Sequence, residues 1–172
     1  MVFIDGTNLF YRLNGAKLQL AKKKIFEIVQ GFLQGRQLVR VYIYTSEPHF
    51  NSAKNKHGDI AFKDLRVVLG DAIPTGDGNY KEKGVDALLV ADLIYHAAVK
   101  NYDYALLVST DTDFVQAIRR VDDFGCRTGV LGICCEIPDR LRSVCDETFL
   151  LDENQILANQ WAKKTPTDKL PN

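Results

Sequence analysis

Short apolar segments alternate with segments of helical periodicity along this chain, and this alternation constrains the fold more than any other feature. Strands are expected where β-branched and aromatic residues dominate a short run, at residues 2–4, 38–45, 72–79 (a short strand and a loop), 103–109, 127–133 and 148–151. Helices are expected where apolar residues recur every three or four positions, at residues 18–33, 53–69 (helical toward its end), 85–101, 113–124 and 153–162, with one helical turn at 141–145. Strands that alternate with helices usually pair in parallel, so we expect a three-layer α/β/α sandwich with a mostly parallel central sheet.

The length of 172 residues is typical of one domain, which we expect at residues 1–162, followed by a polar tail at 163–172 that is expected to be disordered. Hydrophobic residues make up 46% and charged residues 26%, which argues against a disordered, collagenous or coiled-coil chain. No apolar run approaches the roughly 20 residues of a transmembrane helix. No basic segment precedes the first strand, as it would in a signal peptide. A cytoplasmic protein without a membrane partner is therefore expected.

The formal net charge is zero, from 22 Lys and Arg against 22 Asp and Glu, whereas domains that bind nucleic acid are usually basic. This zero is the sum of two unlike halves. Residues 1–70 contain 11 basic and 5 acidic side chains, a net charge of +6, and residues 71–172 contain the other 11 basic and 17 acidic side chains, a net charge of −6. The total therefore does not exclude a nucleic-acid partner.

Cysteine and histidine are too sparse and scattered for a zinc site, because four cysteines form no C-x-x-C pair and only three histidines are present. We expect reduced thiols in a protein core. His96 follows Asp92 by about one helical turn, and we interpret this pair as a surface contact rather than a catalytic dyad.

Carboxylates follow the strands that are expected at the centre of the sheet. Asp5 ends the first strand, and Asp111 and Asp113 follow the strand at 103–109. Ligands of parallel sheets bind beyond the carboxyl ends of the strands. Asp86 stands in the first turn of the helix at 85–101, on the stripe expected to face the sheet, where a charge is costly unless it is paired or bound to a metal. Converging carboxylates of this kind indicate a site for Mg²⁺ or Mn²⁺.

Two of these acids also have simpler interpretations. Asp86 can stabilise the positive N-terminus of its helix, and Asp113 can cap the helix that follows it. The spacing of residues leaves both alternatives open.

Three motifs in order resemble the NYN domains, in particular the LabA-like branch of the PIN-like nuclease superfamily. They are FIDGTNL at residues 3–9, KGVD at 83–86 with Asp92 six residues further on, and STDTDF at 109–114. The resemblance extends from residue 2 to about residue 151, and it implies a PIN-like, Rossmann-like fold. The activity that it implies is that of a metal-dependent ribonuclease, most simply an endoribonuclease, which hydrolyses RNA phosphodiester bonds.

The resemblance also implies roles for individual residues. Asp5, Asp86 and Asp111 would be the metal-site acids, with Asp113 as a fourth acid. A second set would support them: Asn8 as a polar partner of Asp5, Ser109 as the residue that orients the loop of Asp111, and Asp92 as a further acid. Thr7 stands where many relatives carry an acid.

Basic residues near these motifs are candidates for contact with RNA, single-stranded or structured. The strongest candidates are Lys81 and Lys83, which flank the loop before Asp86, and Lys54 and Lys56, which follow the strand at 38–45. Tyr80 can stack on a base or pack on its neighbours. A homodimer is possible, although no apolar stripe demands one.

Other functions fit the residues less well. DGT at residues 5–7 resembles a motif of haloacid-dehalogenase-type phosphatases, but the position of their nucleophile is occupied by Phe3. The chain contains neither a P-loop motif nor a complete dinucleotide fingerprint. The remaining alternative is a catalytically silent PIN-like module that binds RNA or a protein for regulation.

Overall fold

A seven-stranded sheet forms the centre of the protein in the computed structural model, which describes residues 1–21, 24–76 and 78–165. The strand order is β5-β4-β3-β1-β6-β7-β8. Neighbouring strands pair in parallel except β4 and β5, which form an antiparallel hairpin. The strands are β1 (Val2–Asp5), β3 (Val41–Ser46), β4 (Arg66–Pro74), β5 (Tyr80–Lys83), β6 (Tyr104–Val108), β7 (Arg127–Ile133) and β8 (Glu147–Leu151). The expected α/β class with a mostly parallel sheet is confirmed.

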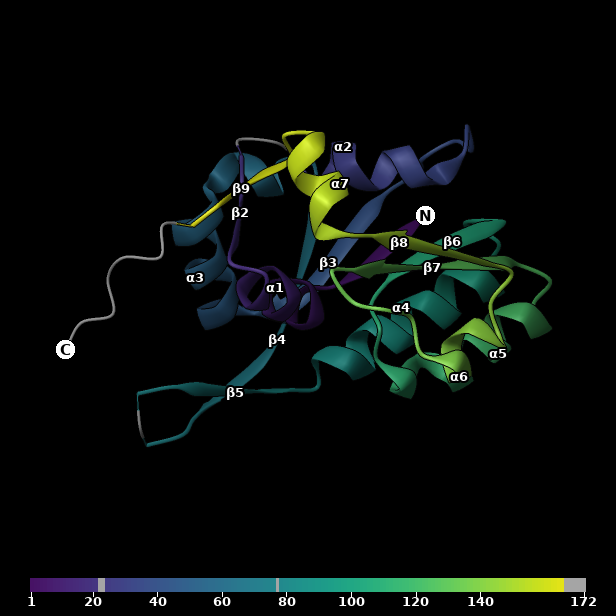
Figure 1. The fold of residues 1–172 in the computed structure, drawn as a ribbon. Helices are drawn as coiled ribbons and strands as arrows, with labels where there is room; N and C mark the ends of the chain where they lie inside the picture. Colours follow the sequence, from purple (N-terminus) through teal and green to yellow (C-terminus); the bar gives the residue numbers. More distant parts are fainter. Residues whose placement is uncertain (22–23, 77, 166–172) are drawn as a thin grey trace.

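Helices cover both faces of this sheet, so the protein has three layers (Figure 1). One face packs against α1 (Gly6–Gly15), α2 (Ile25–Gln30), α3 (Glu47–His57) and α7 (Glu153–Ala158). The other face packs against α4 (Val85–Ala98), α5 (Val115–Asp123) and α6 (Asp139–Arg142). Single 3-10 turns lie at η1 (Gly31–Leu33), η2 (Asp59–Phe62) and η3 (Thr112–Phe114). In the described part of the chain, no helix is long and apolar enough to cross a membrane.

The two cores follow from the period of two along each strand. In β1, Val2 and Ile4 belong to the core beneath α1, whereas Phe3 belongs to the core beneath α4, and all three are fully buried. Because both faces are covered, β1 up to Ile4 and the whole of β6 lack polar residues that would face solvent, as is typical of parallel sheets.

The chain changes direction across the sheet beside β1. From β1 it proceeds to β3 and β4 on one side, and after α4 it returns to β6 on the other side. Such a point, where neighbouring strands lead to opposite sides, opens a crevice at the carboxyl ends of the strands. Here the two strands are β1 and β6, which pair from Val2↔Leu106 to Ile4↔Val108.

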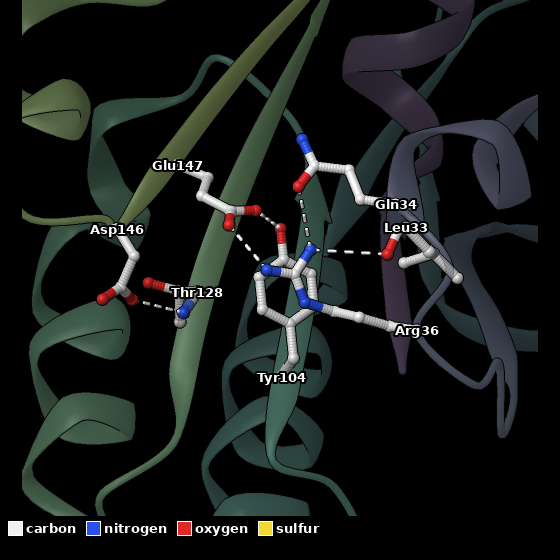
Figure 2. A network of polar contacts seen from close by, with 7 residues as sticks. All are labelled: Leu33, Gln34, Arg36, Tyr104, Thr128, Asp146 and Glu147. Atoms are coloured by element: carbon white, nitrogen blue, oxygen red, sulfur yellow. Dashed lines mark hydrogen bonds and ion pairs between the residues drawn. The ribbon is translucent and has the colours of Figure 1, made fainter.

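The opposite, amino end of the sheet is closed by a polar network (Figure 2). Arg36 donates to Glu147 at 2.6 Å, and its guanidinium lies 4.1 Å from the centre of the Tyr104 ring. The Tyr104 hydroxyl also donates to Glu147, at 2.9 Å. Gly129 leaves room for this arrangement, because a Cβ at that position would lie only 2.0 Å from the Tyr104 hydroxyl. The network joins the segment after η1 to β6 and β8.

Several expected elements are confirmed. The strand at 127–133 has the expected bounds, and the helices at 85–101 and 113–124 and the strand at 38–45 have shifted ends. The expected helix at 18–33 is wrong at its start, where Leu18–Leu20 forms strand β2. The expected helix at 53–69 is also wrong, because α3 lies earlier and ends before Gly58, whose φ is 83°. The hairpin of β4 and β5 occupies most of the following segment.

The C-terminal segment contains one element that the sequence pattern did not predict. Strand β9 (Ala162–Lys164) pairs antiparallel with β2, in a register from Leu18↔Lys164 to Leu20↔Ala162. The expected helix at 153–162 therefore ends earlier, at Ala158, and the first residues of the expected tail lie in a strand. The rest of that tail, residues 166–172, lies outside the described residues.

Candidate active site at the carboxyl edge of the sheet

Asp5 lies at the centre of the candidate site, at the end of β1, with only 4% of its surface exposed. It caps α1, because its Oδ1 accepts a hydrogen bond from the backbone N–H of Asn8 at 2.9 Å. Its Oδ2 accepts from the hydroxyl of Ser109 at 2.8 Å. Burial raises the pKa of Asp5 to about 6; the two hydrogen bonds oppose this rise, and the charges of Asp86 and Asp111 add to it.

Ser109 connects Asp5 to Asp111. Its buried hydroxyl donates to Asp5 and accepts from the backbone N–H of Asp111 at 3.1 Å. Asp111 in turn caps η3, because its Oδ1 accepts from the backbone N–H of Asp113 at 2.9 Å. The capping role considered for Asp113 therefore belongs to Asp111. The side chain of Asp113 is exposed and does not line the cavity, and its negative charge helps to raise the pKa of Asp86.

Asp86 reaches the site from the first turn of α4, but not from the stripe that faces the sheet. That stripe consists of Val85, Leu89, Leu93 and Ala97, all buried, whereas Asp86 is exposed. The expected sheet-facing position of Asp86 is thus wrong by one residue. Its side chain lines the cavity at the carboxyl edge, where partial burial and then the charges of Asp111, Glu82 and Asp113 raise its pKa.

Glu82, which was not among the predicted site residues, brings a fourth carboxylate to this cavity. It accepts hydrogen bonds from the Thr45 hydroxyl at 3.0 Å, from the Ser46 backbone N–H at 2.7 Å and from the Thr7 hydroxyl. Burial favours a raised pKa for Glu82, but these hydrogen bonds outweigh burial and hold the pKa below its usual value. Position 7, where many relatives carry an acid, is occupied here by a threonine, and its hydroxyl binds the carboxylate of Glu82. Glu82 was not predicted as a site residue because its strand, β5, was not predicted.

Arg12 and Tyr11 of α1 also line the cavity. Arg12 donates from Nη2 to the Thr110 hydroxyl at 3.2 Å, and its buried Nε has no hydrogen-bond partner. Its guanidinium lies 5.5 Å from the centre of the Tyr11 ring. Both residues were missed because the pattern at 6–15 did not predict a helix. Arg12 places a positive charge beside four carboxylates.

The cavity has a volume of about 460 Å³ and brings together most, but not all, of the predicted residues. Asp5, Asn8, Asp86 and Asp111 line it, and Ser109 lies beneath it as the link between two of them. Asp92 accepts from the Tyr44 hydroxyl at 2.9 Å instead of facing the cavity. His96, its expected contact, bonds to Tyr42 at 3.1 Å.

The predicted lysines lie around this cavity rather than in it. Lys81 and Lys83 are exposed on β5. Lys54 forms an ion pair with Asp59 at 2.8 Å. Lys56 donates a hydrogen bond to Asn14 and lines a neighbouring groove between α3 and α1.

The donor set of the cavity suits a hard, hydrated cation. All its acidic ligand atoms are carboxylate oxygens, which Mg²⁺ and Mn²⁺ prefer. Among the described residues, no group of three or more His, Cys, Asp or Glu side chains is arranged to hold one ion together. Mg²⁺ usually binds through only one or two carboxylates and keeps several waters. The buried Asp5, with the carboxylates of Asp86 and Asp111 nearby, fits binding of Mg²⁺ through one or two carboxylates.

Comparison with known proteins supports the fold and identifies the family. A crystal structure of a protein of unknown function from Vibrio parahaemolyticus is similar over 94% of both chains, with a TM-score of 0.67 and 18% sequence identity, which supports the fold alone. No curated protein matches this chain. A family model described as the NYN domain matches residues 1–152. Because this match includes all three motifs, at residues 3–9, 83–86 and 109–114, the chain belongs to the NYN domain family of the PIN-like nuclease superfamily.

Proposed function

We propose that this protein is a metal-dependent endoribonuclease, which hydrolyses RNA phosphodiester bonds at the cavity formed by Asp5, Asp86 and Asp111. The observation that carries the proposal is the bridge through Ser109. One buried hydroxyl joins the carboxylate at the end of β1 to the loop at the end of β6, while Asp86 faces the same cavity from α4. Membership of a nuclease superfamily favours the same activity.

Each residue has a role that follows from its contacts. Asp5, Asp86 and Asp111 would hold Mg²⁺ or Mn²⁺, and Asp113 would add negative charge from the exposed side of η3. A divalent ion in such a site activates water and stabilises the charge that develops on phosphate oxygens. Asn8 fixes one oxygen of Asp5 through its backbone N–H, and Ser109 fixes the other.

Residues beyond the acids would position the site and the substrate. Asp92 would hold α4 against β3 through the Tyr44 hydroxyl, and thereby fix the helix that carries Asp86. Arg12, the basic side chain that lines the cavity, would contact a phosphate next to the bond that is cut. Lys81 and Lys83 would contact the RNA backbone more loosely from β5, because they are exposed.

Cleavage of RNA by the purified protein tests this proposal. With Mn²⁺ or Mg²⁺ we expect cleavage that a chelator abolishes. Asp5→Asn and Asp111→Asn should each lower the rate at least about 100-fold, because a bound ion contributes several kcal/mol to stabilising the transition state and each 1.4 kcal/mol is a factor of ten. Asp122→Asn, an exposed acid on α5, is the matched control and should cleave like the unaltered protein. Equal cleavage by all four proteins contradicts the proposal and indicates a contaminating nuclease.

A catalytically silent module that binds RNA is the second candidate. The observation that favours it is Arg12, which lines the same cavity as the four carboxylates and can offset part of their charge without a metal ion. RNA binding without any cleavage, in the presence of either metal, would support this candidate over the enzyme.

A further inference from the structure

Two other hollows adjoin the acidic cavity, and Tyr11 borders all three. One hollow, of about 650 Å³, lies between α1 and the segments that follow β7 and β8. The other, of about 240 Å³, is a groove between α1 and α3. Tyr11 is 70% exposed at the point where they meet the acidic cavity. A polynucleotide that passes from the acidic cavity into either hollow therefore passes this ring.

The charges of the two hollows differ. The larger hollow is lined by Glu136, Asp152 and Glu153, of which Glu153 pairs with Lys164, and by Arg12. Its acids still outnumber these bases, so it repels phosphate groups. The groove between α1 and α3 is lined by Lys56 and His49 and has no carboxylate among its described lining residues. Coulomb forces therefore favour the groove as the path of a phosphate backbone.

The groove is also held in shape by contacts between its walls. Lys56 of α3 donates to the side chain of Asn14 of α1, which fixes the ammonium group across the groove. His57 is buried beneath, stacked on Phe10 at 6.2 Å between ring centres, and accepts from the backbone N–H of Leu20 at 3.2 Å. The groove thus has an apolar floor and one fixed positive charge.

His49 connects this groove to the acidic cavity. Its Nδ1 lies 2.7 Å from the Ser46 hydroxyl and 3.4 Å from Glu82 Oε1. Since Glu82 lines the acidic cavity and His49 lines the groove, a single chain of contacts leads from one to the other. The groove and the acidic cavity also share Thr7 in their walls.

We infer that single-stranded RNA leaves the acidic cavity along the groove between α1 and α3, with one unpaired base stacked on Tyr11 and a phosphate bound by Lys56 and His49. This inference rests on the proposed function, because it takes RNA as the substrate. The inference adds the path of the RNA away from the cavity and the requirement for an unpaired base. An exposed aromatic ring can stack only on a base that is not already paired or stacked within the nucleic acid.

Binding measurements test the inference without cleavage. Fluorescence anisotropy with a fluorescein-labelled single-stranded oligouridylate, in the presence of a chelator, gives the affinity of the full chain. Tyr11→Ala should weaken binding at least about fivefold, as the loss of one stacked base does, while Tyr11→Phe should stay within about twofold. Lys56→Gln should reduce the slope of log K against log salt concentration by about 0.7, the value for one phosphate contact on a single strand. Glu136→Gln, in the acidic hollow, is the control and should not weaken binding.

The outcomes separate this inference from the proposed function. If the unaltered protein cleaves RNA but Tyr11→Ala and Lys56→Gln bind as it does, the groove is not the path and the nuclease proposal stands. If binding depends on both residues but no metal supports cleavage, the groove stands and the nuclease proposal fails. If the unaltered protein does not bind the oligonucleotide, or if Glu136→Gln alone weakens binding, the inference is overturned.

Discussion

A single hydroxyl, that of Ser109, organises the candidate site at the scale of residues. It satisfies one oxygen of Asp5 and one backbone N–H of Asp111. Both contacts are shielded from water, since Ser109 is 2% exposed. Loss of the hydroxyl would leave Asp5 Oδ2 and the backbone N–H of Asp111 without this partner. A buried polar group without a partner costs more free energy than a typical hydrogen bond contributes.

Removal of this hydroxyl should therefore affect both stability and metal binding. We expect Ser109→Ala to lower the free energy of unfolding by about 1–3 kcal/mol. We also expect it to weaken Mn²⁺ binding roughly 10- to 100-fold, as the loss of a residue that orients a metal ligand usually does. Urea unfolding and calorimetric titration with Mn²⁺ measure the two effects. Ser143→Ala, which removes an exposed hydroxyl at the C-terminal end of α6, should change neither; an equal effect of both substitutions would contradict the role of Ser109.

The start of α1 shows how one element is placed against another. Gly6 follows Asp5 directly and is buried against the end of β3. A Cβ at this position would lie 2.6 Å from the carbonyl oxygen of Tyr44 and 3.1 Å from the Cβ of Thr45. Only glycine lets the helix start so near β3, and this close approach brings Asn8, Tyr11 and Arg12 to the site.

A methyl group at Gly6 should therefore push α1 away from the sheet. We expect Gly6→Ala to lower the free energy of unfolding by about 1–3 kcal/mol, the usual cost of overpacking. Gly15→Ala is the matched control at the other end of the same helix, where a Cβ meets nothing within 4 Å. This control should raise stability by about 0.4–1 kcal/mol, because it restricts the unfolded chain. Urea midpoints compare the two, and equal stabilisation by both would contradict the close packing of Gly6.

At the scale of the whole molecule, the small sheet of β2 and β9 joins segments from both ends of the chain. His57 connects it to α3, because its Nδ1 accepts from the backbone N–H of Leu20 in β2. Burial, with the neighbouring charge of Lys56, lowers the pKa of His57 to about 4. The ring is therefore neutral in the folded protein at neutral pH, as its role as an acceptor requires.

This lowered pKa makes stability depend on pH. Below pH 6.5 the unfolded chain binds a proton on this histidine, but the folded protein does so only near pH 4. The contribution of His57 to stability is thus complete above pH 6.5 and is lost as the pH falls toward 4, by about 3 kcal/mol in total.

His57→Asn isolates this contribution, because the amide oxygen can accept from Leu20 without titrating. Urea unfolding between pH 4 and 7 gives the free energy of unfolding of the unaltered protein and of His57→Asn. As the pH falls, the unaltered protein should lose stability relative to the variant. Comparison with the variant removes the opposite trend of Asp5, whose raised pKa favours the folded state in acid. A constant difference over this range would contradict a buried neutral His57.

The charge pattern along the sequence also has a different meaning in the folded molecule. The basic half, residues 1–70, supplies Asp5 to the acidic cavity, while Asp86, Asp111 and Glu82 come from the acidic half. Several basic side chains of the first half are engaged in ion pairs, among them Lys24, Arg36 and Lys54. The acids of the cavity therefore come from both halves of the sequence.

The sequence by itself determined the class of the fold and predicted the principal acids of the candidate site. Strands that are covered on both faces appear in the sequence as short apolar runs, and these runs predicted β1, β6 and β7. The ends of the first two runs also predicted the edge of the sheet where Asp5 and Asp111 lie. The three motifs in order predicted the NYN family, which the match over residues 1–152 confirmed.

Tertiary structure alone decided the rest of the site. Leu18–Leu20 became a strand because it pairs with residues more than 140 positions away, and such partners leave no local pattern. Glu82 entered the cavity through the hairpin of β4 and β5 and three hydrogen bonds from distant residues. Arg12 and Tyr11 reached it because Gly6 allows α1 to approach β3. Contacts between distant segments arise only when the chain packs, so the spacing of residues predicted the acids but not the side chains that surround them.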